Sequence, residues 1–182
     1  MKPPGYSKFK CFNETSEEVA MSERKPKVRI VTLIISLLVP LLVGCFSTLL
    51  TMKDMKIYDK LERPPLAPPG WLFPIIWTLL YIMMGLASYF VLTAFTGPFK
   101  KWIAMCCFYT QLLMNFFWPI LFFTYSRYIL SLIWLIVMFH LIVFCTFKFF
   151  TIRKISGIFM CVLSIWTLFA IYLNFAYVLY SR

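Results

Sequence analysis

The sequence predicts an all-α integral membrane protein built as a bundle of five transmembrane helices. Of its 182 residues, 62% are hydrophobic, 20% are aromatic and only 14% are charged. Soluble domains contain about 45–50% apolar and about 25% charged residues, and a soluble core of this size could not hide so much apolar surface. The apolar residues also gather into five runs, each long enough to cross roughly 30 Å of hydrocarbon.

The chain divides into a polar tail and a membrane domain. Residues 1–29 mix charges with prolines, and we expect them to lack a fixed structure. Residues 30–182 form the five-helix domain. Its spans are expected at about 30–50, 71–95, 102–123, 128–147 and 155–180. A charged, proline-rich connector, residues 51–70, separates the first two spans.

The charges exclude several kinds of function. All seven acidic residues lie within the first 62 positions, and no carboxylate occurs from Arg63 to Arg182. This excludes carboxylate-pair hydrolysis, carboxylate metal cages and Asp/Glu proton relays inside the later spans. The net charge is +11, but the basic residues sit in short clusters between apolar runs. That placement indicates anchors for lipid headgroups and no nucleic-acid partner.

Cysteine and histidine patterns do not predict a metal site. Five of the six cysteines fall inside apolar runs and no CxxC occurs, so we expect them to act as small buried hydrophobes. His140 is the only histidine. Inside a span, a lone histidine more often makes an interhelical hydrogen bond. Axial ligation of a porphyrin metal is the alternative.

Three predicted helix faces combine aromatic and polar residues at helical spacing. They comprise Trp77, Tyr81, Met84 and Ser88; Gln111, Asn115 and Trp118; and Trp166, Ala170, Leu173 and Tyr177 with Asn174 alongside. Because amides are costly in hydrocarbon, these faces should point into the bundle or a cavity. Spacing alone leaves two interpretations open, interhelical hydrogen bonds that hold the bundle together and a ligand cavity.

Three segments together resemble one known family. Pro64 through Tyr89 reads PPLAPPGWLFPIIWTLLYIMMGLASY, Gln111 through Phe123 reads QLLMNFFWPILFF, and Trp166 through Asn174 reads WTLFAIYLN. In this order and spacing, the segments resemble the translocator protein family, also called the peripheral benzodiazepine receptor or tryptophan-rich sensory protein family. The similarity extends over about residues 30–180.

The resemblance implies a ligand-binding function. It implies a homodimeric five-helix bundle that binds cholesterol or another sterol, or porphyrin and haem-type tetrapyrroles, as ligands, with no required cofactor. The pocket would be closed by the 51–70 loop. Carried over by position, the resemblance implies these pocket residues: Trp77, Tyr81, Asn115, Trp118, Trp166, Ala170 and Leu173. It thereby favours the cavity interpretation. It also favours the mitochondrial outer membrane, with the endoplasmic reticulum or another membrane as alternatives.

Departures from the family pattern leave other functions open. Leu66 stands where the family loop usually has the tryptophan linked to light-dependent porphyrin breakdown. This argues against an enzyme, although a porphyrin-degrading enzyme remains one alternative. A membrane scaffold that recruits partner proteins is another. In the fifth span, Val162 and Leu163 replace the family's Pro-Tyr pair, so the kink expected there should be missing.

The family's sterol-recognition segment is shifted in this chain. Leu173, Tyr177 and Arg182 fit a loose L-x-x-x-Y-x-x-x-x-R pattern, and the hypothesis drawn from it is that these residues contact a sterol. The alternative interpretation places Tyr177 and Tyr180 in an aromatic belt at the membrane surface, with Arg182 as a headgroup anchor.

Overall fold

The computed structural model describes residues 29–58 and 67–180, with side chains up to Asp54 in the first range. The helices are α2 (Ile30–Tyr58), α3 (Leu72–Leu92), α4 (Pro98–Pro119), α5 (Tyr128–Ile152) and α6 (Lys154–Tyr180), and a short π-helix, η1 (Ile120–Thr124), extends α4. Across these described ranges no strand occurs, and five helices are long and apolar enough to cross a membrane. The prediction of a five-helix membrane bundle is confirmed.

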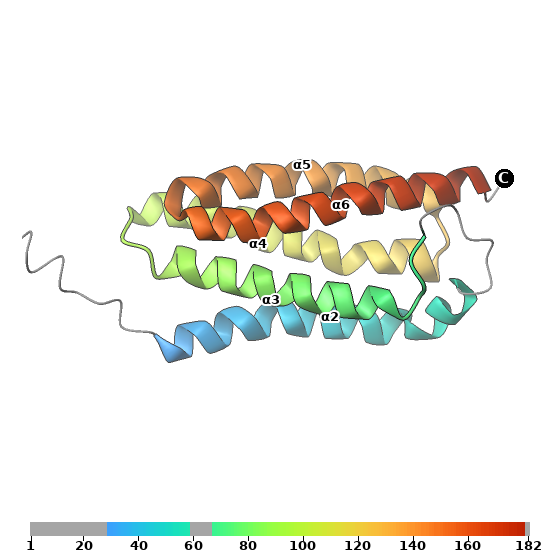
Figure 1. Cartoon of the computed structure of the whole chain (residues 1–182), viewed down its shortest axis with the longest axis horizontal. Coiled ribbons are helices and arrows are strands. Elements are labelled where there is room, and N and C mark those ends of the chain that lie inside the picture. Colours follow the sequence, from blue (N-terminus) through green and yellow to red (C-terminus); the bar gives the residue numbers. More distant parts are fainter. Residues whose placement is uncertain (1–28, 59–66, 181–182) are drawn as a thin grey trace, which may run out of the picture. The chain divides into compact units, whose positions relative to one another are not determined.

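The five helices close into a ring of neighbours. α3 packs against α6, α6 against α5, and α5 against α4, while α3 also contacts α4. α2 completes the ring, because its Ser47 hydroxyl donates a hydrogen bond to the Phe116 carbonyl of α4 at 3.0 Å and its Gly44 contacts α3. Figure 1 shows α2 lying along α3, with α5 and α6 side by side.

α2 and α3 approach each other closely because each helix has a glycine, Gly44 or Gly85, where it contacts the other. A Cβ on Gly44 would fall inside the Tyr81 ring of α3. A Cβ on Gly85 would lie 2.8 Å from the Ser36 carbonyl oxygen and 2.9 Å from the Leu37 Cα of α2. Small residues allow such backbone approach in membrane helices, where packing contacts drive association. Gly44 and Gly85 therefore allow the close contact between α2 and α3.

Several helix ends differ from the predicted ends, and α3 stops at Leu92 instead of about residue 95. α2 continues through Thr51 to Tyr58, so the connector to α3 is shorter than predicted, and its residues 59–66 lie outside the described range. Pro98 begins α4 after Gly97 instead of closing α3, since proline suits the first helical position. α5 runs past Lys148 to Ile152, and only Arg153, in an extended conformation, separates it from α6.

Lys148 is tolerated inside α5 because its ammonium lies 4.9 Å from the centre of the Phe144 ring. A long basic side chain near a helix end can run along apolar neighbours toward the interface. The charge of Lys148 therefore does not end the helix, and the predicted end at about residue 147 is wrong. α6 runs without interruption from Lys154 to Tyr180, so Val162 and Leu163 cause no break.

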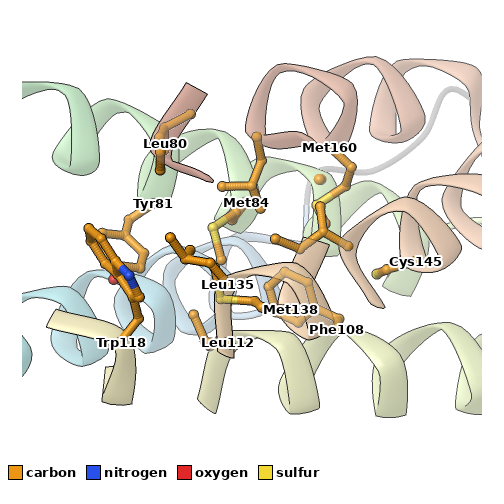
Figure 2. Close-up of a cluster of buried hydrophobic side chains, with 14 of the residues drawn as sticks. Leu80, Tyr81, Met84, Phe108, Leu112, Trp118, Leu135, Met138, Cys145 and Met160 are labelled. Atoms are coloured by element: carbon orange, nitrogen blue, oxygen red, sulfur yellow. The ribbon is translucent and has the colours of Figure 1, made fainter. Parts of the chain in front are cut away.

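Side chains from four helices fill the core of the bundle. Large side chains from α3, α4, α5 and α6 are almost wholly buried there, among them Met84, Phe108, Leu135, Met138 and Met160. Figure 2 shows this cluster, with Tyr81 and Trp118 at its opposite end from Cys145 and Met160. Aliphatic and thioether side chains fill irregular space efficiently, so the space for a site lies toward the Trp118 end.

Two predictions about single residues are wrong. His140 lies on the exposed face of α5, and its Nδ1 lies 2.8 Å from the Ile136 carbonyl oxygen of the same helix. Its hydrogen bond is therefore intrahelical and not interhelical. Among the described cysteines only Cys145 is buried, whereas Cys45 and Cys106 are exposed. In a bilayer, outward-facing positions contact lipid, so an apolar run does not distinguish buried from exposed faces.

Candidate functional site

Two small chambers meet at Trp118. The first holds about 400 Å³ of space, partly open to the outside, between α2, α3 and the end of α4. Its lining residues are Gly44, Ser47, Thr48, Thr51, Phe73, Pro74, Trp77, Tyr81, Trp118, Pro119 and Phe123. Because α2 contributes four of them, this helix forms the outer wall of the first chamber.

The second chamber lies on the α6 side of the same tryptophan. It spans about 240 Å³, counting space that opens to the outside, and is lined by Phe73, Trp118, Phe122, Ala170, Leu173, Asn174 and Tyr177. Phe73 and Trp118 line both chambers. The indole of Trp118, only 3% exposed, is therefore part of the partition between them. Movement of that side chain would join the two spaces.

A continuous line of aromatic rings crosses the site. Ring centroids lie 5.9 Å apart for Trp77 and Trp118, 5.6 Å for Trp118 and Phe122, and 5.6 Å for Phe122 and Tyr177. Tyr81 joins at the other end, 5.7 Å from Trp77. These distances lie in the range of favourable ring contacts, so the walls present flat apolar faces suited to a rigid hydrophobic ligand.

Pro119 and η1 aim the last rings of this line. Proline has no backbone N–H to give to the preceding turn, and directly after Pro119 the chain changes to π-helical geometry. A π-turn rotates the residues that follow it relative to a regular helix. Phe122 is buried as a result, in contact with Trp118, Tyr128 and Tyr177 from three α-helices.

Hydroxyl groups on α2 give the first chamber a polar edge. Ser47 donates to the Phe116 carbonyl, Thr48 to the Gly44 carbonyl at 2.9 Å, and Thr51 to the Ser47 carbonyl at 3.0 Å. Because these hydroxyl protons are used on the backbone, the oxygens remain as acceptors for a ligand.

Several buried polar atoms lack a partner within the described residues. They include Trp118 Nε1, Asn174 Oδ1, Asn115 Oδ1 and Trp166 Nε1. A buried donor or acceptor without a partner costs about 1–3 kcal/mol. Such atoms therefore mark places where a ligand or water would gain a hydrogen bond.

The residues predicted for the pocket do not all meet. Trp77 and Tyr81 line the first chamber, Ala170 and Leu173 line the second, and Trp118 lines both. Trp166 and Asn115 line neither. Trp166 is half-buried, and its ring is tilted against that of Phe169, with ring centroids 5.4 Å apart.

Asn115 is fully buried one turn before Trp118. Its Nδ2 donates to Gln111 Oε1 at 2.8 Å and to the Gln111 carbonyl at 3.0 Å. Both hydrogen bonds lie within α4, so they do not join this helix to another one. The amide orders the helix segment that carries Trp118.

The predicted sterol segment is only partly described. Leu173 and Tyr177 point inward, at 4% and 3% exposure, and both line the second chamber. Tyr177 therefore faces the interior of the bundle, whereas Tyr180 is 53% exposed. Arg182, and Leu66 in the connector, lie outside the described residues. The predicted lid, residues 51–70, also lies partly outside the described residues.

Sequence reasoning missed Phe73, Phe122 and the α2 wall. The signal for α2 was present, because Ser36, Pro40, Gly44, Ser47 and Thr51 recur at helical spacing and form its buried face. The signal for Phe122 was hidden, because a π-turn shifts the helical register by one residue. Across the described residues, no group of three or more His, Cys, Asp or Glu side chains could hold a metal ion.

Comparison with known proteins gives consistent matches. The family model described as the TspO/MBR family matches residues 36–179. The "Tryptophan-rich protein TspO" of Chlorobaculum tepidum is 31% identical over 148 residues, covering 81% of this chain and 94% of its own. Its namesake from Archaeoglobus fulgidus is also 31% identical, covering 82% and 96%. The human "Translocator protein" is 35% identical over 83 residues, covering 44% of this chain and 49% of its own.

Proposed function

Because the chain belongs to the TspO/MBR family and carries its five-helix membrane bundle, we propose that it binds apolar ligands between its helices, as a receptor or translocator. The ligand class we propose is a sterol, such as cholesterol, or a porphyrin or haem-type tetrapyrrole. The observation that carries the proposal is the pair of aromatic chambers meeting at Trp118.

The chamber walls suit a mostly apolar, rigid molecule. Aromatic rings from α3, α4, η1 and α6 line them, and flat rings can stack on a planar or fused-ring ligand. The chambers as they stand are small for such a ligand. Binding therefore requires the Trp118 ring to shift so that the two chambers join, while its indole stays part of the wall of the site.

Three further features belong to the same proposal. We propose a homodimer, a lipid-embedded protein with no required cofactor, and the mitochondrial outer membrane as its location. The relatives named "Translocator protein" come from animals, whereas others come from bacteria and an archaeon. Imaging a tagged chain against mitochondrial and endoplasmic reticulum markers tests the location.

Titration of the purified protein with labelled cholesterol and with protoporphyrin tests the ligand proposal. We expect saturable binding of at least one of them. Trp118→Ala should weaken that binding about tenfold or more, because it removes the ring shared by both chambers. Trp118→Phe should keep the fold and lose less affinity.

Trp102→Ala is the matched control. Trp102 lies on α4 at 65% exposure and lines neither chamber, so its removal should leave affinity unchanged. The absence of saturable binding for both ligands would overturn the proposal. Equal affinity in the wild type and a folded Trp118→Ala variant would show that the ligand does not bind at Trp118.

A further inference from the structure

We infer that Asn174 selects ligands by a hydroxyl group, as a hydrogen-bond acceptor in the second chamber. This inference rests on the proposed binding function and specifies the ligand's polar group and the residue that reads it. The second chamber would then favour a neutral alcohol over an otherwise similar ketone or ether.

The orientation of the Asn174 amide is set by Ser131 of α5. The Ser131 hydroxyl donates its one proton to the Tyr128 carbonyl at 3.0 Å. Its oxygen is then an acceptor, and Asn174 Nδ2 donates to it at 2.8 Å. An amide whose nitrogen is held in this way must present its oxygen elsewhere.

That oxygen is the group left without a partner. Asn174 is 1% exposed and lines the second chamber, and its Oδ1 has no hydrogen-bond partner among the described residues. An amide oxygen accepts but does not donate. Only a ligand group that carries a proton, such as O–H, can satisfy it.

The same chamber offers a complementary donor. Trp118 also lines it, and the indole Nε1–H of Trp118 is buried without a partner in the described part of the chain. An indole N–H can only donate. A hydroxyl, which donates and accepts, can bond to either residue, whereas a carbonyl or ether oxygen can bond to Trp118 alone.

Charge argues for a neutral group. None of the described residues that line either chamber is a lysine, arginine or histidine. A ligand carboxylate placed here would be buried without a counter-ion, which is strongly unfavourable. The acidic groups of a tetrapyrrole would have to remain outside these chambers, and an alcohol fits within them.

The test compares cholesterol with 5-cholesten-3-one, which keeps the ring system and its double bond but has a ketone in place of the hydroxyl. Affinities of both are measured on the purified protein, with protoporphyrin binding as a separate arm. The wild type should bind the alcohol about tenfold more tightly, as expected for one buried hydrogen bond. Asn174→Leu, which keeps the branched shape but removes both polar atoms, should reduce this ratio to about one.

Two further variants test whether Ser131 orients the Asn174 amide. Ser131→Ala removes the acceptor that orients the amide, so it should lower the alcohol-to-ketone ratio without touching the ligand. Ser156→Ala is the control, because Ser156 Oγ is another buried, unpartnered group on α6 that lines neither chamber. Its ratio should equal that of the wild type.

The outcomes separate this inference from the proposed function. Equal wild-type affinity for alcohol and ketone overturns the role of Asn174 while leaving sterol binding intact. A ratio that survives in folded Asn174→Leu does the same. Binding of protoporphyrin alone keeps the proposed function and overturns the hydroxyl preference, and no saturable binding of any probe overturns both.

Discussion

Gly44 is the residue on which the contact between α2 and α3 most depends. Any side chain there meets the Tyr81 ring, which itself lines the first chamber. We predict that Gly44→Ala lowers the stability of the purified protein by about 1–3 kcal/mol, the usual cost of overpacking a tight contact. Thermal unfolding in detergent measures it.

Gly97→Ala serves as the control for this substitution. Gly97 precedes α4 with open space around it and a backbone conformation that alanine adopts readily (φ −57°, ψ 142°). Its melting temperature should match the wild type. Equal melting temperatures for all three proteins would contradict the close approach of α2 to Tyr81.

Phe122 is the second residue with a large expected effect. Its ring contacts Trp118, Tyr128 and Tyr177 at centroid distances of 5.6, 5.3 and 5.6 Å. Phe122→Ala should destabilise the protein by about 3–5 kcal/mol, the range for removing a buried phenylalanine. Phe95→Ala, at a position 89% exposed, should change the unfolding free energy much less.

At the scale of elements, one hydrogen bond ties the end of α2 to η1. Thr124 Oγ1 donates to Asp54 Oδ2 at 2.7 Å across 70 positions of sequence. Asp54 follows the Thr51 wall of the first chamber, and Thr124 follows Phe123. The bond therefore holds the two walls together beside the chamber.

Thr124→Val should loosen this tie. We expect faster hydrogen–deuterium exchange of the backbone amides from Thr51 to Tyr58, because the end of α2 then frays more often. Thr110→Val removes an exposed hydroxyl that bonds only within α4, to the Cys106 carbonyl at 2.9 Å. Unaltered exchange in Thr124→Val, or the same change in Thr110→Val, would count against the tie.

Helix boundaries show what local sequence can predict. The apolar runs predict all five helices, but the predicted spans are too short where a charged residue interrupts the run. Lys53, Asp54 and Lys148 all lie inside helices. Long side chains at the membrane surface can reach water while the backbone stays helical, so a charge near the interface does not end a helix.

For the whole molecule, α4 should place Gly97 and Ser126 on opposite sides of the membrane. Both are exposed positions at the ends of the α4–η1 segment. In a cysteine-free background, Gly97→Cys should react with a membrane-impermeant thiol reagent added on one side of the membrane. Ser126→Cys should react only with reagent added on the other side. Labelling of both from one side of intact vesicles would contradict a spanning α4.

The site was predictable only in part. Trp77 and Tyr81 of α3 line the first chamber together with Trp118 of α4, a grouping that the family resemblance implied and that the spacing on each separate helix could not give. Trp166 shares the α6 spacing with Ala170 and Leu173 but lines neither chamber. Residues separated by three or four positions spread over a wide arc of a helix, so the edge of a face can turn toward another neighbour.

Composition and run length by themselves determined that this protein is a five-helix membrane bundle, because hydrocarbon demands long apolar helices whatever their partners. Only the tertiary structure decided which helices touch and where the space remains. Gly44 and Gly85 bring α2 onto α3, and the π-turn after Pro119 carries Phe122 inward. The Ser131 hydroxyl turns the Asn174 amide. These outcomes depend on contacts between residues far apart in the chain, which no local pattern of hydrophobicity encodes.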